Sequence, residues 1–91
     1  MQNAISEILK GIPQGKVFDS HYAISQLMKL HSDVYNTFVS GAEDTNGTFA
    51  ARHGQIAKEI DKFDTISKNS NKSWSENIHG NPSECTAWVK L

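Results

Sequence analysis

The stretch GKVFDSHYAISQL, residues 15–27, decides how this chain folds, because a strand pattern gives way to a helix pattern inside it. After a turn glycine, the apolar pair Val17 and Phe18 predicts a brief extended strand. Asp19 or Ser20 can then accept backbone N–H bonds and cap a helix that begins at this point. We therefore expect a short strand that runs directly into a capped helix.

Apolar residues at helical spacing lie on both sides of this stretch. Residues 2–10 predict a short helix, which Gly11 and Pro13 are placed to end. A second apolar stripe predicts one long helix over residues 20–40. The triplet His-Ser-Asp at 31–33 could divide this helix, because serine is a good N-cap residue. Since the apolar stripe keeps its register across the triplet, we expect a continuous helix or a mild bend.

A third amphipathic helix is predicted over residues 48–63. Its apolar stripe includes Ile56 and Ile60, and polar side chains follow one another along the opposite face. Gly54 inside this segment costs a helix about 1 kcal/mol relative to alanine. A later start near Gln55 is therefore an open alternative.

Two short segments near the end of the chain, residues 65–68 and 86–91, have the composition of strands. The polar stretch NSNKSWSENIHGN, residues 69–81, lies between them and is expected to form the tip and flanks of a hairpin. A chain of 91 residues is long enough for one small core. We therefore expect a single α+β domain over residues 1–91, with three main helices and a C-terminal β-hairpin.

This order of elements resembles the winged helix-turn-helix class over nearly the whole chain. The resemblance rests on three placements: GKVFDSHYAISQL as a strand entering the second helix, HGQIAKEIDKF (residues 53–63) as the third helix, and residues 65–91 as the wing. It is carried by the arrangement of elements and not by a residue motif. Two features depart from the class, a long second helix and a connection at 41–47 that exceeds the usual three- or four-residue turn.

The resemblance implies a small DNA-binding protein such as a transcriptional regulator, with the third helix in the major groove and the wing on the backbone. On the outward face of that helix, Gln55 is suited to adenine, and Lys58 and Lys62 to phosphates or guanine edges. A solvated helix face has the same composition, so this interpretation stays open beside the first. The DNA-contact candidates are Thr48, Arg52, Gln55, Lys58, Lys62, Lys68, Lys72 and His79.

Charge favours DNA contact only locally. The chain has 9 Lys and Arg against 10 Asp and Glu, a net charge of -1, so it has no global positive field. Residues 48–81 hold five basic and four acidic side chains, whereas residues 1–47 hold three and five. Because so few cations would hold DNA weakly in a monomer, we expect a homodimer.

The alternative function is a non-enzymatic protein-interaction module, such as an inhibitor or adaptor. Its dimer or partner surface would comprise Tyr35, Phe38 and Val39 near the end of the long helix, together with Trp74 in the hairpin. The first three residues can instead complete the core of the monomer. We expect Trp74 to fold back over the core, because an exposed tryptophan lowers solubility, and we expect Trp88 to lie in or beside the core.

The sequence predicts no metal, cofactor or catalytic site. The four histidines and Cys85 lack the paired spacings of metal ligands. We expect His31 and His53 to be hydrogen-bonded residues at the edge of the core. Cys85 and His79 form the nearest candidate nucleophilic pair, but an inert buried thiol explains Cys85 better. One cysteine, no basic leader and no run of about 20 apolar residues favour a cytoplasmic protein.

Overall fold

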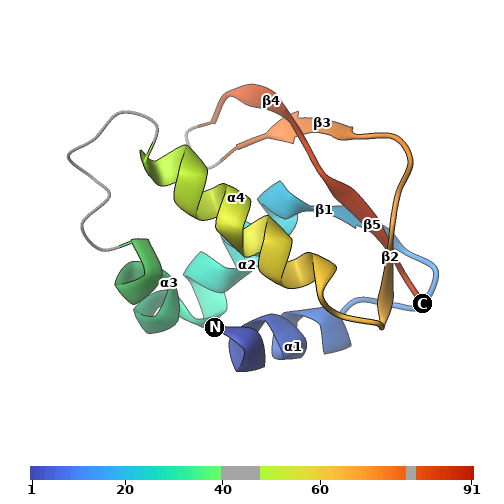
Figure 1. The fold of residues 1–91 in the computed structure, drawn as a ribbon, viewed down its shortest axis with the longest axis horizontal. Helices are drawn as coiled ribbons and strands as arrows, with labels where there is room; N and C mark the ends of the chain where they lie inside the picture. Colours follow the sequence, from blue (N-terminus) through green and yellow to red (C-terminus); the bar gives the residue numbers. More distant parts are fainter. Residues whose placement is uncertain (40–47, 78–79) are drawn as a thin grey trace.

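The computed structural model describes residues 1–39, 48–77 and 80–91 (Figure 1). Within these ranges the chain is an α+β domain, as predicted, but it contains four helices where three main helices were expected. None of the helices in the described ranges is both long and apolar enough to span a membrane. The elements in chain order are α1 (Gln2–Lys10), β1 (Val17–Asp19), α2 (Ser20–Leu30), α3 (Ser32–Val39), α4 (Thr48–Asp61), β2 (Ile66–Lys68), β3 (Ser73–Glu76), β4 (Pro82–Cys85) and β5 (Ala87–Lys90).

The strands form two antiparallel sheets. The chain leaves the first sheet after β2, forms the second sheet with β3 and β4, and returns to the first sheet at β5. β5 lies between β1 and β2 in a three-stranded sheet, with Phe18 opposite Trp88 and Ile66 opposite Lys90. β3 and β4 pair with each other in a second sheet. β3 lies inside the segment 69–81 that was expected to form the hairpin tip and flanks, and β4 begins directly after that segment, at Pro82. In Figure 1, α4 runs between the β3–β4 hairpin above it and α1 and α3 below it.

The core joins the helices to the three-stranded sheet. Trp88 on β5 is 0% exposed, and its ring lies 5.5 Å from the ring of Phe18. The Trp88 indole N–H donates to Oδ1 of Asp61 at 2.7 Å, which places the end of α4 against β5. The expected core position of Trp88 is confirmed. Fourteen other buried side chains complete this cluster: Ala4, Ile5, Ile8, Leu9, Ile12, Phe18, Ala23, Ile24, Leu27, Tyr35, Val39, Ile56, Ile60 and Ile66.

The first helix ends where the sequence predicts, and a distant strand completes its cap. α1 stops before Gly11, whose N–H donates to the carbonyl of Ile8. The Lys90 ammonium, on β5, donates to the Leu9 carbonyl at 2.6 Å and to the Ile12 carbonyl at 3.0 Å. A cation at the C-terminus of a helix satisfies carbonyls that have no partner within the helix and complements its dipole.

The long helix predicted over residues 20–40 is wrong, because the chain breaks at His31 into α2 and α3. His31 leaves the helical conformation, with φ −136° and ψ 51°, and its Nε2 pairs with Oε2 of Glu7 at 2.9 Å. A second helix then begins at Ser32. The contact of His31 with α1 therefore accompanies a break that the continuous apolar stripe does not predict. α4 begins at Thr48, so the alternative start near Gln55 is also wrong.

Candidate nucleic-acid interface and hairpin junction

The solvent-facing side of α4 carries the polar residues that the sequence places there. Gln55, Lys58 and Lys62 are exposed, whereas Ile56 and Ile60 are buried against the rest of the domain. Gln55 and Lys58 are three positions apart and share one side of α4. Lys62 follows directly after Asp61, the last residue of α4, where the sequence predicted a helix to residue 63. These three exposed side chains are called the α4 stripe. The structure therefore offers this stripe to a partner without any rearrangement of the core.

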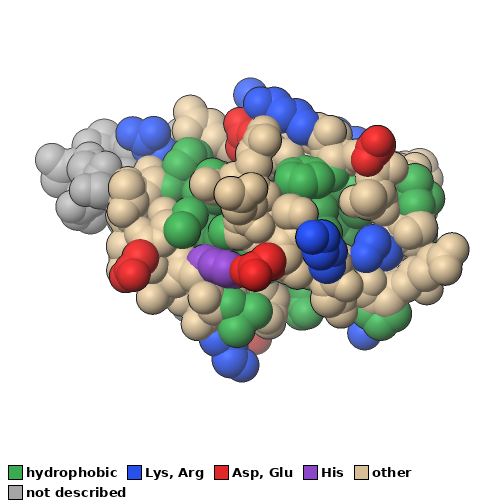
Figure 2. Space-filling view, turned by 90° about the horizontal axis from the view of Figure 1, so that it is seen from below, with side chains coloured by type: hydrophobic (Ala, Val, Ile, Leu, Met, Phe, Trp, Pro, Cys, Tyr) green, Lys and Arg blue, Asp and Glu red, His purple; other side chains and the backbone are tan. Residues whose placement is uncertain are grey.

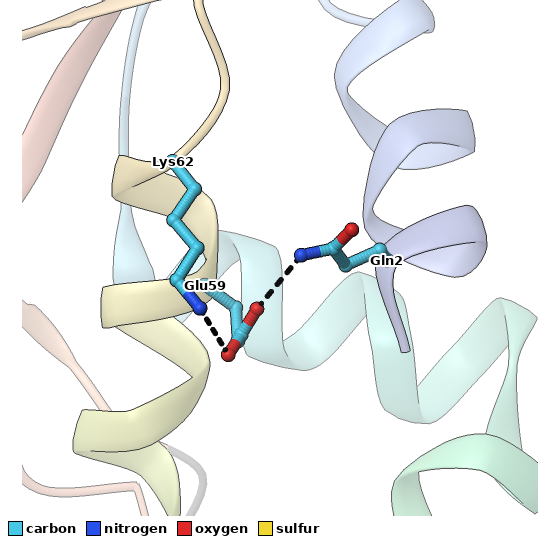
Figure 3. Close-up of polar contacts among 3 residues, drawn as sticks. All are labelled: Gln2, Glu59 and Lys62. Carbon is cyan, nitrogen blue, oxygen red and sulfur yellow. Dashed lines mark hydrogen bonds and ion pairs between the residues drawn. The ribbon is translucent and has the colours of Figure 1, made fainter.

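Lys62, in the turn that follows α4, is paired with an acidic side chain of the last turn of that helix. Its ammonium donates to Oε1 of Glu59 at 2.9 Å, and the Gln2 amide of α1 donates to Oε2 of the same carboxylate at 3.1 Å (Figure 3). Hydrogen bonds from Lys62 and then from Gln2 hold the pKa of the Glu59 carboxyl below its usual value. The positive charge of Lys62 is thus largely compensated within the domain.

The other predicted cations differ in how far their charge is compensated. Lys68 on β2 lies 3.8 Å from Oδ2 of Asp61, and the Arg52 guanidinium stacks over the Phe38 ring, 5.8 Å from its centroid. No carboxylate of the described ranges lies within ion-pairing distance of Lys58 or Lys72. Among the predicted DNA contacts, the positive charge that is available to an anionic partner is therefore that of Lys58, Lys72 and Arg52.

One face of the molecule carries charges of both signs. The face drawn in Figure 2 carries both basic and acidic side chains, and no patch of one sign covers the whole of it. This distribution agrees with the net charge of -1. Any attraction of an anion must therefore come from a few local cations and not from a field of the whole protein.

Two of the predicted DNA contacts have no described side chain. Thr48 begins α4, but its side chain is not described, and His79 lies outside the described residues, as does the 41–47 connection. These residues are therefore neither placed with the α4 stripe nor separated from it.

A cluster of polar side chains, here called the hairpin junction (Asp19, His21, Ser73, Ser75 and Ser83), fastens β3 and β4 to the start of α2. Asp19 is the N-cap of α2 and accepts the Tyr22 N–H at Oδ1, 2.8 Å away. Its other oxygen, Oδ2, accepts the hydroxyls of Ser73 at 2.7 Å and Ser75 at 2.8 Å. One carboxylate therefore both starts a helix and holds a strand.

Opposing effects set the pKa of Asp19. Burial by itself raises the pKa of this carboxyl, but hydrogen bonds from the Tyr22 amide, Ser73 and Ser75 lower it, as does the charge of His21. The net result is a pKa below the ordinary value. The ionised carboxylate is therefore the form that holds the hairpin junction together.

His21 bridges both strands of the hairpin. Its Nδ1 lies 2.8 Å from the Ser75 hydroxyl and its Nε2 lies 3.3 Å from the Ser83 hydroxyl. Because Ser75 donates its proton to Asp19, the Ser75 oxygen is the acceptor for a protonated Nδ1. In a nucleophilic triad the imidazole lies between the serine and the carboxylate, whereas here the serine lies between the other two. The cluster is arranged to fix a hairpin and not to activate a nucleophile.

The hairpin junction turns the serines inward and Trp74 outward. Trp74 is 71% exposed, so the expectation that it folds back over the core is wrong. Successive residues of a strand point to opposite faces, and the two serines on either side of Trp74 are bonded to Asp19. Cys85 is buried on the same inner side, with its Sγ 3.9 Å from the Ser75 hydroxyl.

The predicted partner surface at the end of the second helix is mostly core. Tyr35 and Val39 are 5% and 7% exposed, so these two residues are not available to a partner. They complete the core of the monomer, which is the alternative that the sequence left open. The Tyr35 hydroxyl lies 2.9 Å from Nε2 of His53, and burial raises the pKa of that hydroxyl. Phe38 is half-buried and lines an apolar hollow with Val34.

Sequence reasoning found the stripe on α4 but missed the hairpin junction. The one signal for it was Asp19 as a helix cap, whereas the serines of the hairpin and His21 were not assigned any role. The histidines at positions 31 and 53 are hydrogen-bonded, as expected. Within the described ranges no group of three or more His, Cys, Asp or Glu side chains is placed to hold a metal ion.

Comparisons with family models, curated proteins and solved structures return no match.

Proposed function

We propose that this chain is a DNA-binding domain of the winged helix-turn-helix class, in which α4 enters the major groove. The observation that carries the proposal is the exposed stripe of Gln55, Lys58 and Lys62, which leaves one side of α4 free of tertiary packing. The order of helices and strands, with β5 between β1 and β2, also supports it. A regulator of transcription is the role that such a domain would serve.

Each residue of the proposed interface has a distinct part. Gln55 offers the amide that pairs with an adenine edge, whereas Lys58 and Arg52 contact phosphates on either side of it. Lys72, in the connection between β2 and β3, adds a phosphate contact. Lys62 contributes less because Glu59 compensates its charge.

The salt dependence of binding gives the first test. Three phosphate contacts in one copy predict that affinity falls about 40-fold between about 50 and about 200 mM salt, because each contact releases about 0.9 of a counterion. A homodimer with six contacts predicts a fall of about 2,000-fold over the same range. Fluorescence anisotropy with a labelled mixed-sequence duplex measures both the slope and the affinity. Absence of binding at the lowest salt would overturn the proposal.

Charge reversal at one residue tests the placement of the interface. We expect Lys58→Glu to weaken DNA binding at least about tenfold and to flatten the salt slope by about 0.9. Lys16→Glu makes the same change in net charge before β1, which is an edge strand on the opposite side of β5 from β2. It should leave the affinity within about twofold, because only long-range screened charge changes. Equal losses in both variants would assign the effect to net charge alone.

Release of Lys62 from Glu59 should strengthen DNA binding. Glu59→Gln removes the carboxylate but keeps an oxygen that can accept the Gln2 amide. We expect affinity to rise about three- to tenfold and the salt slope to steepen by about 0.9, because one more cation reaches phosphate. Asp64→Asn, just beyond the end of α4, is the matched control for the loss of one negative charge. If both variants gain equally, Lys62 lies outside the interface.

A further inference from the structure

The outer face of the hairpin carries an aromatic side chain between two carboxylates. We define this outer face as Trp74, Glu76, Pro82 and Glu84, all of which are exposed. Glu84 is the cross-strand partner of Trp74, and Glu76 follows on the same side of β3, opposite Pro82. Neither carboxylate has a basic partner among the described residues. A large apolar ring and two uncompensated negative charges therefore share one small surface.

The orientation of this face is built into the fold. A shift of one residue in β3 would turn Trp74 inward and the serines outward, which would bury about 150–250 Å² of ring surface. The structure has the opposite arrangement, because Asp19 and His21 bind the serines on the inner side. Specific hydrogen bonds thus hold an aromatic side chain in solvent.

The charge of the outer face excludes two of the possible occupants. DNA phosphates would meet Glu76 and Glu84 and be repelled by them. A second copy that docked by the same face would place four carboxylates together, because a two-fold interface brings identical patches into contact. A cationic partner, in contrast, meets both carboxylates favourably, and tryptophan is the aromatic residue that binds a cation most strongly over its ring.

We propose that the outer face of the hairpin binds a basic segment of another protein. An Arg or Lys side chain of that segment lies on the Trp74 indole, and Glu76 and Glu84 pair with its charge. This function goes beyond the proposed DNA contact, because it uses the outer face of the hairpin, where Glu76 and Glu84 repel DNA phosphates. The same chain then has two surfaces of opposite preference, a cationic stripe on α4 and an anionic aromatic face on β3 and β4.

The probe for this surface is a fluorescein-labelled peptide of alternating arginine and glycine, with a peptide of citrulline and glycine as the uncharged control. We expect saturable binding of the arginine peptide at low salt, together with quenching of Trp74 fluorescence. The buried Trp88 should contribute an unchanged signal. Trp74→Ala and the double variant Glu76→Gln/Glu84→Gln should each weaken binding about tenfold, whereas Asp33→Asn/Asp64→Asn, with the same change in net charge, should stay within about twofold.

Four results would overturn this proposal. They are equal binding of the citrulline peptide, equal loss in the Asp33→Asn/Asp64→Asn control, conversion of a dimer to a monomer by Trp74→Ala, and loss of DNA affinity in Trp74→Ala. The third result would assign the face to a second copy and the fourth to DNA. Lys58→Glu should retain full peptide binding, so failure of the DNA proposal and failure of this one give different patterns.

Discussion

Replacing Trp88 with alanine should lower the free energy of unfolding by about 3–5 kcal/mol, the range found for deletion of a large buried aromatic side chain. Trp88 is the largest of the fully buried side chains and lies in the central strand of the three-stranded sheet. Its removal leaves a cavity beside Phe18 and takes away the indole donor of Asp61. For a domain of this size, such a loss lowers the melting temperature by more than about 12 °C.

Urea unfolding followed by circular dichroism measures this loss. Trp74→Ala is the matched control, because it deletes the same side chain from a position that is 71% exposed. We expect the control to change stability by less than about 0.5 kcal/mol. Trp88→Phe, which keeps a ring but no N–H donor, should fall between the two. A loss below about 1 kcal/mol in Trp88→Ala would contradict the central position of this residue.

Replacing Asp19 with alanine should cost about 2–3 kcal/mol, the second-largest expected effect. Loss of a helix N-cap costs about 0.5–2 kcal/mol, and the serine hydroxyls of β3 also lose a charged acceptor. Because the hairpin junction is only partly buried, we use the lower part of the free-energy range for hydrogen bonds to a charged group. The amides of β3 and β4 should exchange faster with solvent than those of β5, since the hairpin loses its attachment while the central sheet keeps its core.

Asn is the matched substitution at position 19. Asp19→Asn keeps an oxygen that can cap α2, so its cost should be smaller and confined to the hairpin. Hydrogen exchange monitored by NMR separates the two effects residue by residue. Uniform loss of protection in α2 and in the hairpin for both variants would refute separate capping and fastening roles.

The same carboxylate makes stability depend on pH in acid. The pKa of Asp19 is lowered in the folded state, so its contribution is complete at pH values above the ordinary carboxyl pKa of about 3.9. That contribution is lost as pH falls through the lowered folded value, because the unfolded state takes up the proton first. Asp19→Asn should therefore flatten the acid limb of the stability curve.

The α4 stripe shows how much of the candidate site can be predicted from the sequence alone. Helical periodicity alone places Gln55, Lys58 and Lys62 on one exposed side, because the period of a helix is a local property. The i,i+3 spacing of Glu59 and Lys62 also signals their pairing. The contribution of Gln2 has no local signal, since it lies 57 residues away from Glu59.

The partner residues show where sequence patterns are ambiguous. An apolar stripe at Tyr35 and Val39 fits either a core or an interface, and only the packing of α3 against the remaining helices decides for the core. For Trp74 the general preference of aromatic residues for burial predicts the wrong side of the strand. Its exposure follows from the hydrogen bonds that Asp19 accepts from the two neighbouring serines and that the Nδ1–H of His21 donates to Ser75.

The sequence by itself determined the class of the fold, the end of α1, the entry of β1 into α2 and the two sides of α4. Each of these depends on residues within a few positions of one another, whose caps and spacing act before any tertiary contact forms. Only the tertiary structure decided the break at His31, the capping of α1 by Lys90 and the outward turn of Trp74. Those features depend on polar contacts between distant segments, such as the bond of Lys90 to a carbonyl 81 residues away. A periodic pattern contains no information about such contacts, because it records which side of an element is apolar and not what that side meets.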